Sequence, residues 1–375
     1  MNVWLLLGLL VVTILPSCLV SWLVVGLVRR QAGRLGLLDK PNERKVHEQP
    51  IPLGGGIGIW AGVMATLGAG TLVVLLLSSF PSLAGALPSS IAENLPGLQG
   101  KISEIWVIAG CGSVLAVLGL MDDRYGLPWW VRLAIEIAVA SFCVYWQGLR
   151  LTAYIELPWL TSCMSVIWIV ALVNSFNMLD NMDGLSGGVA SISSLLLAFM
   201  LLMATGGGQQ QPQLFVAAML FILVGSLVGF LFHNWPPAKI FMGDAGSYFI
   251  GFWIAVATLL ATYTGYQGSR PHAVVAPLIV MAVPLYDMLS VIVIRLREGR
   301  SPFEADKKHF SHRLVELGMS KKQAVLTIYL ATATCSLSAL LLPRVDWVGA
   351  VLIVLGTALV LCLIRVLESV GRQER

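Results

Sequence analysis

Carboxylate and amide side chains gather in the stretch FNMLDNMDGLSGG, residues 176–188, between two apolar runs. The two aspartates and two asparagines are Asp180, Asp183, Asn177 and Asn181. Asn177, Asp180 and Asp183 are spaced by three, so a helix would present them on one broad face. Ionised groups next to lipid are costly unless they serve a polar purpose. The stretch therefore predicts a polar site, although a solvated helix end before a glycine turn would also explain it.

Further aspartates occur in three other segments, two of them at the ends of apolar runs and the third in the inner half of a run. They are Asp122 and Asp123 in LGLMDDRYGLP, Asp244 in HNWPPAKIFMGDAGS and Asp287 in VPLYDMLSVIVIRL. Acids that gather in one place repel one another unless a cation neutralises them, and oxygen ligands of this kind suit Mg²⁺ together with substrate phosphates. The GDAGS segment also opens a helix, whose free amides would attract phosphate.

A basic loop precedes the second apolar run and reads LLDKPNERKVHEQPIPLGGG. Its prolines stiffen it, and Arg44, Lys45 and His47 could meet a lipid phosphate at the membrane surface. Ordinary anchoring of cations on the cytoplasmic side would explain the same residues.

A second basic loop, SPFEADKKHFSHRL, holds His309, His312 and Arg313. The two histidines share a helical face, and contact with phosphate or sugar is the favoured interpretation. A zinc site made of these histidines and Asp306 is disfavoured, because the neighbouring lysines and arginine would repel the metal.

Membrane spans must position these residues, because 57% of the chain is hydrophobic and 12% is charged, against roughly 25% charged in soluble domains. A span needs about 20 mostly apolar residues. Eleven runs qualify, or ten if the short third run or the tight turn at 342–347 is discounted: 4–28, 53–78, 105–121, 129–147, 158–177, 185–204, 213–232, 247–265, 273–295, 323–342 and 347–366. We therefore expect residues 1–375 to form a single all-α, multi-pass membrane domain.

The distribution of cations predicts the orientation of these spans. With eleven spans, 20 of the 24 lysines and arginines fall on one side, which is then cytoplasmic. The N-terminus is expected outside, the C-terminus inside and the polar site at the cytoplasmic face. The first run is longer than a signal-peptide core and lacks a preceding basic segment, so we expect it to be a span. The six cysteines lie in apolar runs without a CxxC pair, which argues against a disulfide framework.

Five ordered motifs resemble those of one enzyme family. They are DKPNERKVHEQPIPLGGG, LGLMDDRYGL, NSFNMLDNMDGLSGG, PAKIFMGDAGS and SPFEADKKHFSHRL, between about Gly36 and Lys322. In them the chain resembles the polyprenyl-phosphate N-acetylhexosamine 1-phosphate transferases, the WecA/TagO-like glycosyltransferases of type 4, with MraY as a more distant relative. Ser311 stands where many relatives have a third histidine, and Asn181 stands where a glycine is usual.

The resemblance implies a reaction and its partners. Such enzymes transfer N-acetylglucosamine 1-phosphate, or a related sugar phosphate, from a UDP-sugar to undecaprenyl or another polyprenyl phosphate and release UMP. This is the first membrane step of a cell-envelope glycan, such as lipopolysaccharide or teichoic acid. The resemblance implies Mg²⁺ as cofactor, with Mn²⁺ as a substitute, and the bacterial plasma (inner) membrane as location. It implies no nucleic-acid partner and allows a homodimer.

The resemblance also implies roles for single residues. Asp244 is expected to bind the metal. The residues expected to act in catalysis are Asp122, Asp123, Asp180 and Asp183. Those expected to bind substrates are Arg44, Lys45, His47, Asn177, His309, His312 and Arg313.

Two other functions compete with this one. A phospho-N-acetylmuramoyl-pentapeptide transferase is disfavoured by the SPF and DKKH sequences in the histidine loop. A transporter would explain Glu136 and Asp287 within apolar runs. It would, however, place its polar groups near the midplane of repeated helices, whereas most acids here lie at one edge.

Overall fold

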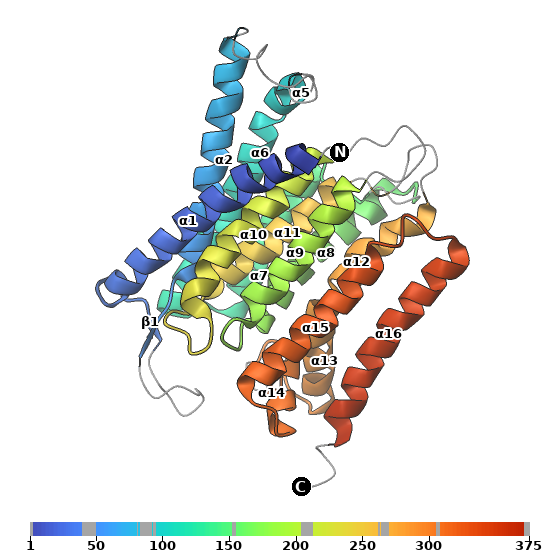
Figure 1. Cartoon of the computed structure of the whole chain (residues 1–375). Coiled ribbons are helices and arrows are strands. Elements are labelled where there is room, and N and C mark those ends of the chain that lie inside the picture. Colours follow the sequence, from blue (N-terminus) through green and yellow to red (C-terminus); the bar gives the residue numbers. More distant parts are fainter. Residues whose placement is uncertain are drawn as a thin grey trace.

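The computed structural model describes residues 3–370 apart from 40–49, 81, 83–91, 93–94, 152–154, 204–212, 262, 264–269 and 305–307. The described chain is a bundle of helices (Figure 1). In the described part, the one sheet is the antiparallel pair of β1 (Leu38–Asp39) and β2 (Ile51–Pro52). The prediction of an all-α fold is confirmed.

Each predicted apolar run coincides with helical structure. The long helices are α1 (Val3–Leu35), α2 (Gly55–Ser79), α6 (Ile102–Tyr125), α7 (Trp129–Tyr145), α8 (Pro158–Leu179), α9 (Leu185–Leu202), α10 (Leu214–Asn234), α11 (Asp244–Leu260), α13 (Ala282–Arg297), α15 (Lys321–Ala339) and α16 (Trp347–Val370). The shorter elements are α5 (Leu95–Gly100), η1 (Pro271–Val275), α12 (Ala276–Val280) and α14 (Phe310–Glu316).

Several helices are long and apolar enough to cross a membrane. Among the described residues there are seven, namely α1, α2, α6, α8, α9, α10 and α16. An eighth results if η1–α12 and α13, which meet at an angle of 63°, are one broken span. Helix α11 is apolar but shorter, and α7 and α15 are not both long and apolar enough to qualify as membrane spans. The chain is thus a multi-pass membrane protein of helical class.

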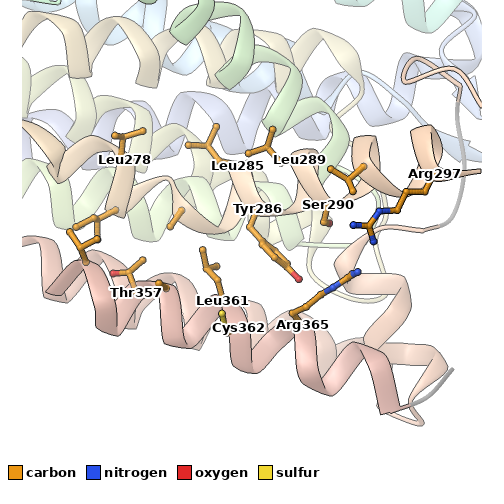
Figure 2. A pocket seen from close by; sticks show the side chains of 15 residues that line it. Leu278, Leu285, Tyr286, Leu289, Ser290, Arg297, Thr357, Leu361, Cys362 and Arg365 are labelled. Carbon is orange, nitrogen blue, oxygen red and sulfur yellow. The ribbon is translucent and has the colours of Figure 1, made fainter. Parts of the chain in front are cut away.

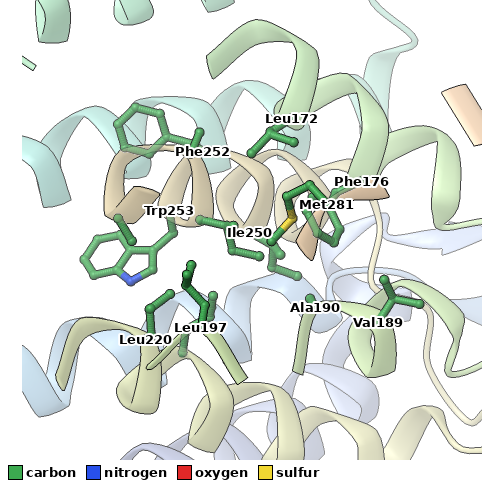
Figure 3. Packing of buried hydrophobic residues seen from close by; sticks show 14 of the residues in the cluster. Leu172, Phe176, Val189, Ala190, Leu197, Leu220, Ile250, Phe252, Trp253 and Met281 are labelled. Atoms are coloured by element: carbon green, nitrogen blue, oxygen red, sulfur yellow. The ribbon is translucent and has the colours of Figure 1, made fainter. Parts of the chain in front are cut away.

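Helix α11 lies at the centre of the bundle and packs against α6, α8 and α2. Its residues from Ala245 to Thr258 are all buried, as expected for a helix that is apolar on every side. Figure 3 shows Phe252 and Trp253 of this helix among side chains of its neighbours, including Leu172 of α8 and Leu220 of α10. Because α11 begins at Asp244, this packing fixes the position of that carboxylate.

Helices α1 and α16 form outer edges of the bundle. Only 11% of the apolar window of α1 and 17% of that of α16 is buried, so both leave apolar faces for lipid. The two chain ends lie at opposite sides of the bundle in Figure 1. Helices α13, α15 and α16, in orange and red, form a C-terminal group that contacts the rest through α8 and α9.

Candidate active site

Glycines let two helices approach the start of α11. A Cβ on Gly56 of α2 would lie 2.1 Å from the backbone nitrogen of Gly246, and one on Gly119 of α6 would lie 2.3 Å from the carbonyl of Asp244. The amides of Gly55 and Gly56 donate to the carbonyls of Phe241 and Met242, both at 2.9 Å. Backbone packing thus holds the segment around Asp244 in place.

Asp123 binds the first turn of α11. Its Oδ1 accepts from the amide of Asp244 at 3.0 Å, and its Oδ2 accepts from the amide of Ala245 at 3.4 Å. A carboxylate is favourable at a helix N-terminus. Gly243 precedes the helix with φ of 73°, and a Cβ there would lie 2.4 Å from Asp123. These two amides, expected to attract phosphate, are therefore bound by a carboxylate of the chain itself.

Asp122 is 8% exposed and accepts three hydrogen bonds. The amide of Leu127 donates to Oδ1 at 2.7 Å, while Arg132 and the hydroxyl of Tyr248 donate to Oδ2 at 2.5 and 3.4 Å. The same Nη1 of Arg132 lies 3.9 Å from Oδ2 of Asp244. Arg132 thus bridges two of the predicted acids. Sequence reasoning assigned it only to the cytoplasmic cations, although a charge inside an apolar run was a signal of a polar role.

Two residues of the 176–188 motif reach the same place from the end of α8. Asn177 donates to Oδ1 of Asp244 at 2.7 Å and to Oγ of Ser247 at 3.2 Å. Asp180 caps the helix. Burial raises the pKa of Asp180 to about 7, and the negative charges of Asp123 and Asp183 add to this rise, while a hydrogen bond from the backbone of Gly243 opposes it.

Asp183 follows in the turn before α9 and accepts from the amide of Ala238 at 2.9 Å. It holds the segment that leads to Asp244. Together with Asp122, Asp123, Asp180 and Asp244 it makes up what we call the carboxylate cluster.

The carboxylate cluster fits a hard divalent cation. Five acids lie close enough to affect one another, and Arg132 is the cation that contacts them in the described part of the chain. Among the described residues, no three His, Cys, Asp or Glu side chains are arranged to hold a metal by themselves. Mg²⁺ usually takes one or two carboxylates and completes its shell with water and substrate phosphates, so this donor set suits it.

A second set of predicted residues lies on and beside α14. Nδ1 of His309 donates to Oδ2 of Asp287 at 2.9 Å, and the amide of Phe310 donates to Oδ1 of Asp287 at 2.7 Å. Asp287 therefore orients the histidine loop, a role that sequence reasoning did not assign to it. The ring of His312 lies 6.4 Å from that of His309. Arg313 donates to Oγ of Ser290 at 3.0 Å.

One hydrogen bond joins this histidine helix to the motif at the end of α8. Oγ of Ser311 donates to Oδ1 of Asn181 at 2.5 Å. The two positions at which the sequence differs from the usual family pattern are thus in direct contact. The bond places α14 beside the turn that carries Asp180 and Asp183.

The first basic loop has no described structure at its tip. Arg44, Lys45 and His47 lie outside the described residues, as does Asp306. The base of the loop is formed by β1 and β2, and the carbonyl of Pro52 accepts from the amide of Phe241 at 2.8 Å. The loop therefore begins and ends next to the segment that leads to Asp244.

Fold and site together define a multi-pass helical membrane protein whose helix ends bring acids, one arginine and a histidine helix together. Residues 105–262 match the family described as glycosyl transferase family 4. The chain is 33% identical over 341 residues to a probable undecaprenyl-phosphate N-acetylglucosaminyl 1-phosphate transferase of Bacillus subtilis (strain 168), covering 89% of this chain and 85% of the relative.

Two further relatives are similar over most of their length. A decaprenyl-phosphate N-acetylglucosaminephosphotransferase of Mycolicibacterium smegmatis is 33% identical over 93% of this chain and 86% of the relative. An undecaprenyl-phosphate alpha-N-acetylglucosaminyl 1-phosphate transferase of Escherichia coli (strain K12) is 31% identical over 81% of this chain and 76% of the relative. The chain belongs to glycosyl transferase family 4.

Proposed function

We propose that this protein transfers N-acetylglucosamine 1-phosphate from UDP-N-acetylglucosamine to a polyprenyl phosphate and releases UMP. The observation that carries this proposal is the convergence of three helices on Asp244. From α6, Asp123 binds its amide and Gly119 packs on its carbonyl; from α7, Arg132 faces its carboxylate; from α8, Asn177 binds that carboxylate. The names of the relatives, each an N-acetylglucosamine 1-phosphate transferase, support this donor over a muramoyl-pentapeptide donor. A transporter is not favoured.

The cofactor in this proposal is Mg²⁺, held by Asp244 with Asp123 or Asp180 beside it. When bound, the metal would neutralise the diphosphate of the sugar nucleotide and stabilise the departing UMP. Asn177 and Arg132 orient the Asp244 carboxylate, while Asp123 holds its backbone amide. This positioning matters because phosphoryl transfer depends mainly on positioning and charge neutralisation.

In the proposed reaction, a phosphate oxygen of the lipid attacks the β-phosphorus of the sugar nucleotide. A phosphomonoester has a second pKa near 6, so the lipid phosphate is largely ionised at neutral pH and needs little help from a base. Both oxygens of Asp122 already accept hydrogen bonds, which makes this carboxylate a poor nucleophile. Direct displacement is therefore favoured over an aspartyl-phosphate intermediate, and Asp122 acts by holding Arg132 against the site.

The remaining predicted residues bind the two substrates in this proposal. His309, His312 and Arg313 contact the diphosphate and sugar, with His309 oriented by Asp287. Arg44, Lys45 and His47 contact the lipid phosphate from the first loop. We further propose eleven spans, an outer N-terminus, an inner C-terminus and a site at the cytoplasmic face of a bacterial plasma membrane, supported by the uneven distribution of lysine and arginine.

The test uses purified protein with polyprenyl phosphate and Mg²⁺. UDP-N-acetylglucosamine, UDP-N-acetylgalactosamine and UDP-muramoyl-pentapeptide are offered separately, and UMP release is followed. We expect lipid-dependent UMP from UDP-N-acetylglucosamine, loss of it with EDTA, recovery with added Mg²⁺, and loss in Asp244→Asn. Release from the pentapeptide donor alone, or turnover that EDTA leaves unchanged, would contradict the proposal.

A further inference from the structure

An apolar groove of about 650 Å³ lies between α16 and the bent pair of α12 and α13 (Figure 2). Leu278 of α12, Leu285 and Leu289 of α13, and Leu361 of α16 line most of its length. Since α16 is mostly exposed, the groove lies at the flank that the bundle presents to lipid. Its surface suits hydrocarbon chains.

The groove ends in two cations. Arg297 stands at the last position of α13, and Arg365 stands near the end of α16; both line the groove. Figure 2 shows their guanidinium groups and the hydroxyl of Tyr286 pointing into the same end. Two arginines and a phenol at the end of an apolar groove are complementary to a phosphate headgroup that carries apolar tails.

The position of α13 indicates whether a phosphate in the groove could be the reacting phosphate of the acceptor lipid. The face of α13 opposite the groove carries Asp287, which binds His309, and Met288, whose sulfur accepts from Ser175 of α8 at 3.3 Å. A helix with its side chains is about 10 Å across. A phosphate bound by Arg297 and Arg365 would therefore lie on the face of α13 away from Asp287, and none of the acids of the carboxylate cluster lines the groove.

We infer that the groove between α13 and α16 binds an anionic phospholipid of the membrane, with its phosphate between Arg297 and Arg365. The lipid completes the packing of α16, which contacts mainly α13, α14 and α15 in the described part of the chain. It also supports α13 beside the histidine helix, since Ser290 lines the groove and accepts a hydrogen bond from Arg313 of α14. This inference does not depend on the proposed transferase activity.

The test measures retained lipid directly. Full-length protein is taken from vesicles of equal parts phosphatidylglycerol and phosphatidylcholine, and bound lipid is counted by native mass spectrometry. We expect phosphatidylglycerol to be retained at least about fivefold over phosphatidylcholine, and this preference to fall to near one in Arg297→Gln/Arg365→Gln. The matched control is Arg30→Gln/Arg34→Gln, two exposed cations near the end of α1, which should keep the preference.

A second variant, Ala358→Trp, fills the groove without removing charge and should lower retention of both lipids. It keeps the inference testable if the double arginine variant does not fold. An unchanged preference in the arginine variant, or unchanged retention in Ala358→Trp, would overturn the inference. Preferential retention of added polyprenyl phosphate over phosphatidylglycerol, lost in the arginine variant, would assign the groove to the acceptor lipid instead. None of these readouts requires turnover, so a failure of the proposed function would not be mistaken for a failure here.

Discussion

Substituting Gly119 by alanine should displace the proposed metal ligand without touching any ionisable group. The new methyl carbon would lie 2.3 Å from the carbonyl carbon and oxygen of Asp244, whereas ordinary contact begins at 3.4 Å. Helices α6 and α11 would have to separate locally by about 1.1 Å, the difference between these distances. The hydrogen bond from the amide of Asp244 to Asp123, now 3.0 Å long, would then break. A misplacement of about 1 Å can cost about 100-fold in rate, which is the loss in kcat we expect.

The matched control is Gly110→Ala in the same helix. A Cβ at Gly110 meets nothing within 4 Å, so this variant should keep full turnover, and the higher helix propensity of alanine is worth up to about 1 kcal/mol. The assay is UMP release by the two purified variants, with thermal unfolding in detergent to confirm that both are folded. Overpacking should also lower the stability of Gly119→Ala by about 1–3 kcal/mol. Wild-type turnover by a folded Gly119→Ala protein would refute the argument that backbone contact positions Asp244.

Three further predictions concern charge, pH and the contact between the two halves of the site. Arg132→Gln should lower the free energy of unfolding by about 3 kcal/mol, because Asp122 stays buried without its guanidinium partner. Adding Asp122→Asn to this variant should recover part of the lost stability. Equal stabilities of the wild type and Arg132→Gln would contradict the prediction. The pKa of Asp180 is raised to about 7 in the folded protein, from roughly 3.9 in the unfolded chain, so the folded state favours the protonated carboxyl. Without divalent cations, Tm should therefore fall between pH 4 and pH 7 and level off above pH 7. Asp180→Asn should flatten this dependence of Tm on pH, and an equally steep dependence in the variant would rule out Asp180 as its cause. Ser311→Ala should cost about 1 kcal/mol, and Asn181→Ala about 2 kcal/mol because Asn181 also donates to the carbonyl of Met178. The double variant should cost about as much as Asn181→Ala alone, and full additivity in denaturant unfolding would show that the bond between Ser311 and Asn181 contributes nothing.

The helices and the identity of the acids were predictable from sequence, because each carries a local signal. Apolar runs define the helices, and aspartates at the ends of such runs are too costly to be incidental. The predicted acids Asp122, Asp123, Asp180 and Asp244 do meet in space. The count of eleven spans stays a prediction, since α7 and α15 are less apolar or shorter than the helices that qualify as spans.

The partners of those acids could not be predicted, because they depend on contacts between distant parts of the chain. The place of Arg132 inside an apolar run signals a polar role, but its partner Asp122 becomes visible only when α6 and α7 are placed together. Gly56 and Gly119 resemble any glycine of a membrane helix until Gly246 and Asp244 are found against them. Asp287 was counted among the acids expected to gather at one face, and its bond to His309 becomes visible only when α13 and α14 are placed together.

The hydrogen bond between Ser311 and Asn181 has a consequence for how the family changes over generations. Both side chains are small to medium in size, and Oγ of Ser311 lies 2.5 Å from Oδ1 of Asn181. The usual family pattern has a large histidine at the first position and a glycine, with no side chain, at the second. Serine with asparagine and histidine with glycine have similar total side-chain volumes. Histidine with asparagine would overpack the contact, and serine with glycine would leave a cavity there. Descendants of this protein should therefore exchange the two residues jointly, and a lineage that alters one should soon alter the other.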